Sequence, residues 1–133
     1  MRARSVRSQW TRAGGALLAA VLLASPATSE AGEAQVVAAR ADCEPERICH
    51  FTVTVRHADN GWEHYADRWE VLDESGRILA VRVLRHPHVD EQPFTRSLIG
   101  VVLPAEVERV RIRAHDSVHG DGPEVAVELD RGD

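Results

Sequence analysis

The chain contains no lysine, and all 16 of its basic residues are arginine. Schiff-base catalysis and Walker-type phosphate loops both require lysine, so both are excluded. Methionine is as scarce, because the single copy is Met1. Thioether coordination of Cu(I) is therefore excluded once the N-terminal segment with Met1 has been removed. A blue-copper site, which needs a cysteine late in the chain, is excluded as well.

Cysteine occurs only twice, at Cys43 and Cys49. In an exported protein such a pair normally forms a disulfide. The alternative is that the two thiolates bind a metal. A disulfide here would close a small loop and fix the start of the first long strand.

Long hydrophobic runs are also lacking. The longest, residues 16–24 (ALLAAVLLA), is too short for the ~20 residues that span a bilayer. Four arginines precede this run and small residues follow it at 25–27. The pattern predicts a secretory signal peptide over 1–27, with an uncleaved membrane anchor as the alternative. We therefore expect a periplasmic or secreted protein with a flexible terminus at 28–34 and one domain at 35–133.

Positive charge is scarce once the signal peptide is removed. Twelve arginines then face 21 acidic residues, which gives a net charge of −9. Such a surface does not favour nucleic acid or anionic membranes. No segment after the signal peptide predicts stable membrane insertion.

Helical periodicity is absent, and alternation of apolar and polar residues recurs instead. Six strands are predicted at 35–40, 48–57, 64–72, 77–85, 94–103 and 107–114, and a seventh near 125–129. Short strands at this spacing are typical of an immunoglobulin-like or fibronectin III-like β-sandwich. A small Greek-key or jelly-roll barrel is the alternative.

The histidines are the most informative residues present. Six of the seven fall in or beside three predicted loops, at 58–63, 86–93 and 115–123. The first loop contains the turn signal Asn60-Gly61, and the prolines at 87 and 93 bracket the second. By alternation, His57 lies at the end of its strand on the same face as the apolar residues. Connections alternate between the two ends of an antiparallel sandwich, so these three loops should share one end. The six histidines are His57, His64, His86, His88, His115 and His119.

Imidazole combined with carboxylate favours Zn²⁺ or Cu²⁺. The first choice of ligands is His86 and His88, because alternate residues of an extended segment lie on one face. His115, His119 or His57 would complete the site. Nearby carboxylates are expected to orient the histidines rather than bind the metal, and these are Asp59, Asp90, Glu91 and Asp116.

Three other readings remain. In the first, the polar residues only brace loops in a periplasmic interaction or assembly module. In the second, Trp62 stacks on a sugar, whereas Trp69 is assigned to the core. In the third, Ser117 serves as a nucleophile, but no Gly-x-Ser-x-Gly motif accompanies it. No catalytic residue is assigned, and a binding protein is favoured over an enzyme.

Overall fold

The computed structural model describes residues 32–129, so the predicted signal peptide lies outside the described residues. All regular structure within this range is β, as predicted, and none of it is a helix that could cross a membrane. The strands are β1 (Gln35–Cys43), β2 (Ile48–Arg56), β3 (Ala66–Leu72), β4 (Ile78–Val83), β5 (Phe94–Val102), β6 (Arg109–Asp116), β7 (Gly120–Asp121) and β8 (Val125–Glu128).

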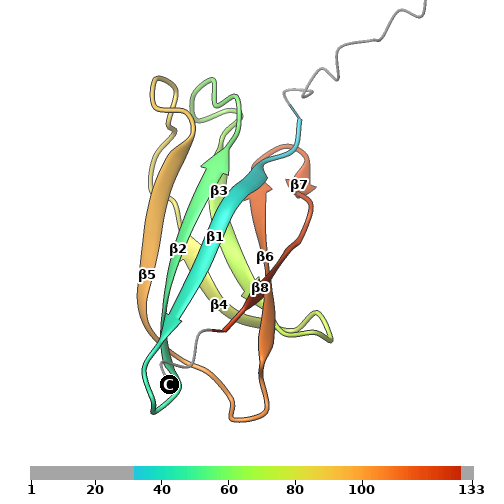
Figure 1. Ribbon diagram of the computed structural model, residues 1–133. Helices are drawn as coiled ribbons and strands as arrows, with labels where there is room; N and C mark the ends of the chain where they lie inside the picture. Colours follow the sequence, from blue (N-terminus) through green and yellow to red (C-terminus); the bar gives the residue numbers. More distant parts are fainter. Residues whose placement is uncertain (1–31, 130–133) are drawn as a thin grey trace, which may run out of the picture.

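The strands form two antiparallel sheets that pack as a β-sandwich (Figure 1). One sheet has the order β1-β2-β5, and the other has the order β4-β3-β6-β7, with β8 also paired to β6. Eight strands are described where seven were predicted, because the short strand β7 lies within the predicted loop 115–123. β7 pairs with the end of β6 and β8 with its start, and Pro123, which has no N–H, lies between them.

The core lies between the sheets and follows the predicted alternation in most strands. Phe51, Val53 and Val55 of β2 are fully buried. Trp69 of β3 is also fully buried, as predicted. The alternation fails at the start of β3, where a register shift relative to β6 leaves Ala66 buried. An extra residue in one strand of a pair moves the following side chains to the opposite face, which a simple period of two cannot anticipate.

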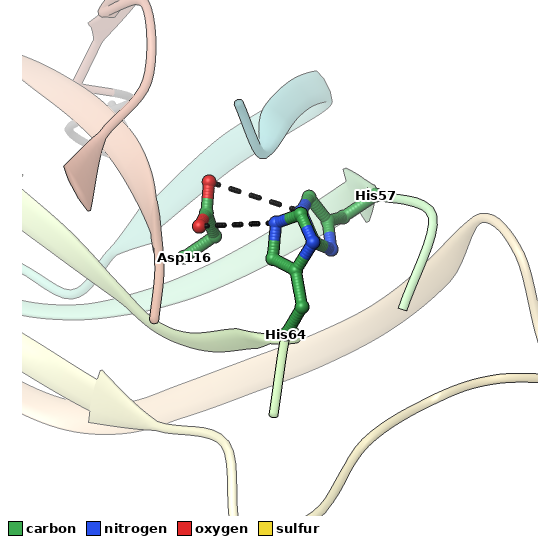
Figure 2. A group of neighbouring side chains, drawn as sticks. All are labelled: His57, His64 and Asp116. Atoms are coloured by element: carbon green, nitrogen blue, oxygen red, sulfur yellow. Dashed lines mark ion pairs between the residues drawn. The ribbon is translucent and has the colours of Figure 1, made fainter. Parts of the chain in front are cut away.

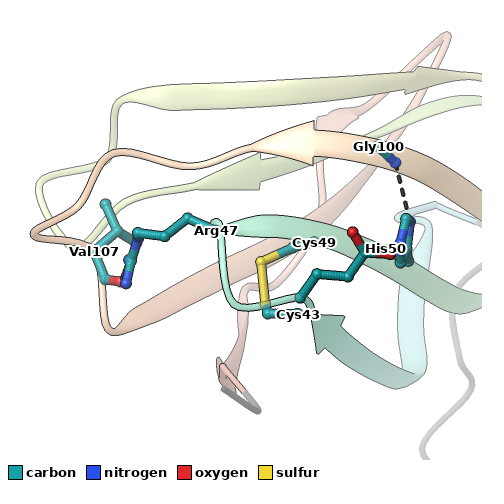
Figure 3. The surroundings of a disulfide bond; sticks show 7 residues. Cys43, Arg47, Cys49, His50, Gly100 and Val107 are labelled. Atoms are coloured by element: carbon teal, nitrogen blue, oxygen red, sulfur yellow. Dashed lines mark hydrogen bonds and ion pairs between the residues drawn. A yellow bond between two sulfur atoms is a disulfide. The ribbon is translucent and has the colours of Figure 1, made fainter. Parts of the chain in front are cut away.

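The disulfide between Cys43 and Cys49 is present, as predicted (Figure 3). The two residues face each other in the β1–β2 register, so the bond closes the hairpin at its turn. In that turn Arg47 has a positive φ of 66°, and its side chain donates a hydrogen bond to the carbonyl of Val107. This contact joins the hairpin to the β5–β6 connection.

The other end of the sandwich carries the β2–β3, β4–β5 and β6–β7 connections (Figure 1). We call this end the histidine pole, defined by residues 57–65, 84–93 and 116–119. The chain before β1 packs against it, since Gly32 and Ala34 are buried and the carbonyl oxygen of Gly32 lies 3.3 Å from Nε2 of His57. Gly122 allows this close approach, since a Cβ there would lie 1.9 Å from the carbonyl oxygen of Ala34. Part of the segment predicted to be a flexible terminus therefore covers the pole, whereas residues 28–31 lie outside the described range.

Candidate metal centre

Three side chains converge at the histidine pole: His57, His64 and Asp116 (Figure 2). One ligand atom from each lies within 4.8 Å of the other two. His57 follows β2, His64 lies in the β2–β3 connection, and Asp116 is the last residue of β6. The group thus joins residues from both sheets.

Strand alternation explains why two of these side chains point inward. His57 continues the inward-facing series of β2, and Asp116 continues the series of Val110, Ile112 and Ala114 in β6. Both side chains are completely buried. His64 is placed differently, by a bridge with Gly61 that closes the turn before β3.

The Asp116 carboxylate is bound firmly on one side and unpartnered on the other. Its Oδ1 accepts hydrogen bonds from the backbone N–H groups of Val118 (2.8 Å) and His119 (2.7 Å). Its Oδ2 is buried, has no hydrogen-bond partner, and lies 3.8 Å from Nε2 of His57. Nearly all buried polar atoms in proteins are paired, so this oxygen calls for an explanation.

His64 presents a second unpartnered atom to the same space. Its Nε2 is buried without a hydrogen bond, although it lies only 3.3 Å from Oδ1 of Asp116. The His57 and His64 rings meet edge to face, with centroids 4.8 Å apart. One nitrogen and one oxygen therefore face a common space without partners.

His57 is oriented by a buried carboxylate. Its Nδ1 lies 2.5 Å from Oδ1 of Asp59, which also accepts a hydrogen bond from the backbone N–H of Ala66 at 2.9 Å. The other oxygen of Asp59 accepts from the N–H of His88 at 2.7 Å. The ring of His57 is thereby fixed with Nε2 toward Asp116, and a carbonyl oxygen, that of Gly32, lies 3.3 Å from Nε2.

Electrostatics favour the charged form of Asp116. Burial alone would raise its pKa, but the N–H groups of His119 and Val118 and the nearby His57 and His119 act in the opposite direction. The net result is a pKa below the ordinary value for an aspartate. A buried carboxylate that stays ionised is a good ligand for a cation.

The predicted first-choice ligands, His86 and His88, lie outside this group. Nε2 of His88 accepts a hydrogen bond from Arg96 at 2.8 Å, and the ring stacks on Phe94 with centroids 3.9 Å apart. Arginine has only donors, so the lone pair of this nitrogen is occupied. His88 therefore could not bind a metal through Nε2 without losing its contact with Arg96.

Of the remaining predicted residues, one lies beside the group of three and the others have different partners or are exposed. His119 is adjacent, with its ring 4.9 Å from that of His64, and it is partly exposed. His115 instead pairs with Asp67 at 2.6 Å. Asp90 and Glu91 are exposed, and Glu91 lies 3.3 Å from Arg96. Of the six predicted histidines, the group in residues 32–129 thus contains His57 and His64.

Asp116 was expected to orient a histidine and not to bind the metal, although strand alternation indicated a larger role. Extending the inward series of β6 by one more alternate residue, beyond Ala114, would have placed this carboxylate inside the pole. The predicted strand ended at 114, whereas β6 continues to Asp116. The same rule had already placed His57 on the inward face of its strand.

The other readings of this pole can be compared with the structure. The hydroxyl of Ser117 accepts a hydrogen bond from the N–H of Tyr65 at 3.1 Å, so it braces two loops. Trp62 is 65% exposed and packs edge to face on Tyr65, with ring centroids 5.5 Å apart. Trp62 is thus at the surface, as predicted, and Ser117 has a structural contact.

The buried environment of His88 predicts that the stability of the protein depends on pH. Burial lowers the pKa of His88 below 6.5, and the charges of Arg96 and His86 act in the same direction. The folded protein therefore binds fewer protons here than the unfolded chain, so stability is complete above about pH 6.5 and falls as the pH is lowered. We expect the free energy of unfolding in urea to decrease between pH 7.5 and 5.5, and His88→Gln to show a smaller decrease. Equal pH dependence in both proteins would contradict this account of His88.

Comparisons with known proteins find one informative relative. No family model matches the chain, and no solved structure matches it. A protein named "Putative lipoprotein" from Halomicrobium mukohataei is 38% identical over 95 residues. The match covers 71% of this chain but 46% of that protein, so the chain spans about half the length of this relative.

Proposed function

We propose that this protein is an exported metal-binding protein that holds Zn²⁺ or Cu²⁺ through His57, His64 and Asp116. The observation that carries the proposal is the pair of buried unpartnered atoms, Nε2 of His64 and Oδ2 of Asp116. A bound divalent cation would satisfy both, whereas the metal-free protein leaves both without a partner. Two imidazoles and a carboxylate are a donor set typical of zinc.

The distances suit this ion after a contraction. With bonds of about 2.0–2.1 Å, tetrahedral ligands lie about 3.3 Å from one another. Nε2 of His64 lies 3.3 Å from Oδ1 of Asp116, and Nε2 of His57 lies 3.8 Å from Oδ2. One ligand atom from each of the three residues lies within 4.8 Å of the other two. Side-chain movements that shorten the widest of these separations are required, and the fourth position would go to water or to His119.

The surrounding residues prepare His57 for this role. Asp59 accepts a hydrogen bond from Nδ1–H of His57, so Nε2 is left to provide a lone pair to a metal. This arrangement is common around zinc-bound histidine. In the metal-free protein Nε2 lies 3.3 Å from the carbonyl oxygen of Gly32 and 3.8 Å from Oδ2 of Asp116. A metal binds imidazole only in its neutral form and aspartate only when it is ionised, so binding should weaken as the pH falls.

Fold and location are part of the proposal. The sheet orders β1-β2-β5 and β4-β3-β6-β7 support a fibronectin III-like sandwich if β7 and β8 count as one interrupted strand. The disulfide and the lipoprotein name of the Halomicrobium relative both support export. These observations and the predicted signal peptide support a periplasmic location.

A second function, an interaction or assembly module, is favoured by a specific observation. Asp59 and Asp116 together accept four hydrogen bonds from backbone N–H groups. The donors are Ala66, His88, Val118 and His119. The bonds of Asp59 join the β2–β3 connection to the β4–β5 connection, and those of Asp116 hold the β6–β7 connection. Under this alternative the carboxylates would be present for rigidity alone, and a metal would bind weakly or without defined stoichiometry.

The test is a titration of the mature protein, prepared without a histidine tag, with Zn²⁺ and then Cu²⁺ by calorimetry. We expect one equivalent to bind, with release of about one proton, seen as a dependence of the heat on buffer ionisation. Metal content measured by mass spectrometry after purification provides an independent value. Weak uptake without a plateau at one equivalent would overturn the metal proposal and favour the interaction module.

A further inference from the structure

A second polar site lies at the edge of the sandwich where β4 and the β4–β5 connection meet β5. It is a cavity of about 150 Å³. Its lining consists of Arg82, Leu84, Arg85, His86, His88 and Arg96. The lining thus includes three guanidinium groups and two imidazoles and has no carboxylate, in a protein whose predicted mature charge is −9.

Two of the guanidinium groups are held in place mainly by neutral acceptors. Arg82 donates to the carbonyl oxygens of Ser97 (2.9 Å) and Val83 (2.6 Å). Arg96 donates to the carbonyl of Thr95 at 2.7 Å and to His88. Carbonyl oxygens position these groups without cancelling their charge, so an anion in the cavity would meet preorganised donors.

Among residues 32–129, one exposed carboxylate forms an ion pair with a guanidinium group of this cavity. Glu91 lies 3.3 Å from Arg96 and is 59% exposed, so solvent screens this pair. Arg85 is exposed, and no carboxylate of residues 32–129 pairs with it. The cavity therefore keeps an excess of positive charge.

His88 supplies a further unpartnered donor. Because its Nε2 accepts a hydrogen bond from Arg96, the proton of the neutral ring resides on Nδ1. That Nδ1 is buried and has no hydrogen-bond partner, and the ring is only 4% exposed. The ring of His86 lies beside it, with centroids 4.5 Å apart. An acceptor is missing here, whereas the proposed metal centre lacks a cation.

We propose that this cavity binds a phosphate group, with Arg82, Arg85 and Arg96 as the charged contacts and His88 as a buried donor. Guanidinium groups are well suited to phosphate oxygens because each presents paired N–H donors in one plane. The cavity has the size for a single tetrahedral oxyanion and not for a nucleotide. The same positive charge opposes a cation at His86 and His88, where the sequence had suggested one. This proposal does not depend on the metal centre.

The test uses inorganic phosphate at constant ionic strength, maintained with sodium chloride, on metal-free protein. Binding is followed by the side-chain NMR signals of His86 and His88. We expect these signals to shift and saturate, and Arg85→Gln to weaken the affinity by about tenfold or more, the loss expected for one charged hydrogen bond. Arg85 makes no structural ion pair among the described residues, so the variant should fold normally.

Arg109→Gln is the matched control. It removes the same charge from the opposite end of the sandwich, where Arg109 pairs with Glu128. We expect it to leave phosphate affinity unchanged. Absence of saturation, or equal weakening by both substitutions, would overturn the site and indicate general charge screening. Acetate binding as tightly as phosphate would overturn the assignment to a tetrahedral oxyanion.

Discussion

Replacing His64 with alanine is expected to abolish stoichiometric binding of Zn²⁺ while leaving the metal-free protein as stable as before. The affinity should fall by more than about 100-fold, because even residues that only orient a metal ligand contribute about 10–100-fold. Stability should change by less than about 1 kcal/mol, since Nε2 of His64 has no hydrogen bond to lose. Calorimetric titration and urea denaturation of the same preparation measure both quantities.

Two further variants make this prediction specific. Asp116→Asn keeps an oxygen for the N–H groups of Val118 and His119 but removes the negative charge, so it should weaken zinc binding to a similar degree. His86→Ala removes an exposed imidazole from the same pole, outside the group of three, and should bind zinc normally. If His86→Ala loses the metal and His64→Ala retains it, the centre proposed here is wrong.

Replacing Asp59 with alanine is expected to destabilise the protein strongly, whether metal is present or not. The change leaves three donors without an acceptor: Nδ1 of His57 and the N–H groups of Ala66 and His88. Breaking such a buried charged network costs about 3–5 kcal/mol. For a domain of this size a loss of 3 kcal/mol lowers Tm by about 12–24 °C. Thermal unfolding with and without one equivalent of Zn²⁺ is the measurement.

Asp90→Ala is the control for this second prediction. Asp90 is exposed at the same pole, and its removal should change stability by less than about 0.5 kcal/mol. A similarly small effect of Asp59→Ala would show that the hydrogen bonds around this carboxylate do not hold the loops together. The Asp59 and His64 variants together separate bracing from metal binding, because the first should act on stability and the second on affinity.

Some of the candidate centre could be predicted from local patterns. The turn at Asn60-Gly61 and the prolines at 87 and 93 marked the connections of the histidine pole. Alternation placed His57 on the inward face of its strand. The disulfide followed from two cysteines separated by a short loop in a chain with a predicted signal peptide. Each of these inferences depends on residues close together in the sequence.

The choice among the histidines could not be made in that way. His86 and His88 have the spacing of a chelating pair, yet Phe94 and Arg96 of β5 engage the ring of His88. Asp116 was predicted to lie in a loop, because the predicted strand 107–114 ends two residues before β6 does. Which nitrogen keeps a free lone pair depends on partners that lie up to 59 positions away, as between His57 and Asp116.

The sequence by itself determined the all-β class, the disulfide and the gathering of histidine-bearing loops at one end, because strand alternation and turn residues act over a few neighbouring positions. Only the tertiary structure decided that His57, His64 and Asp116 meet and that the arginines gather around His86 and His88. The physical reason is that a binding site depends on unsatisfied donors and acceptors. Whether an atom is satisfied is known only when strands distant in the chain have been packed together.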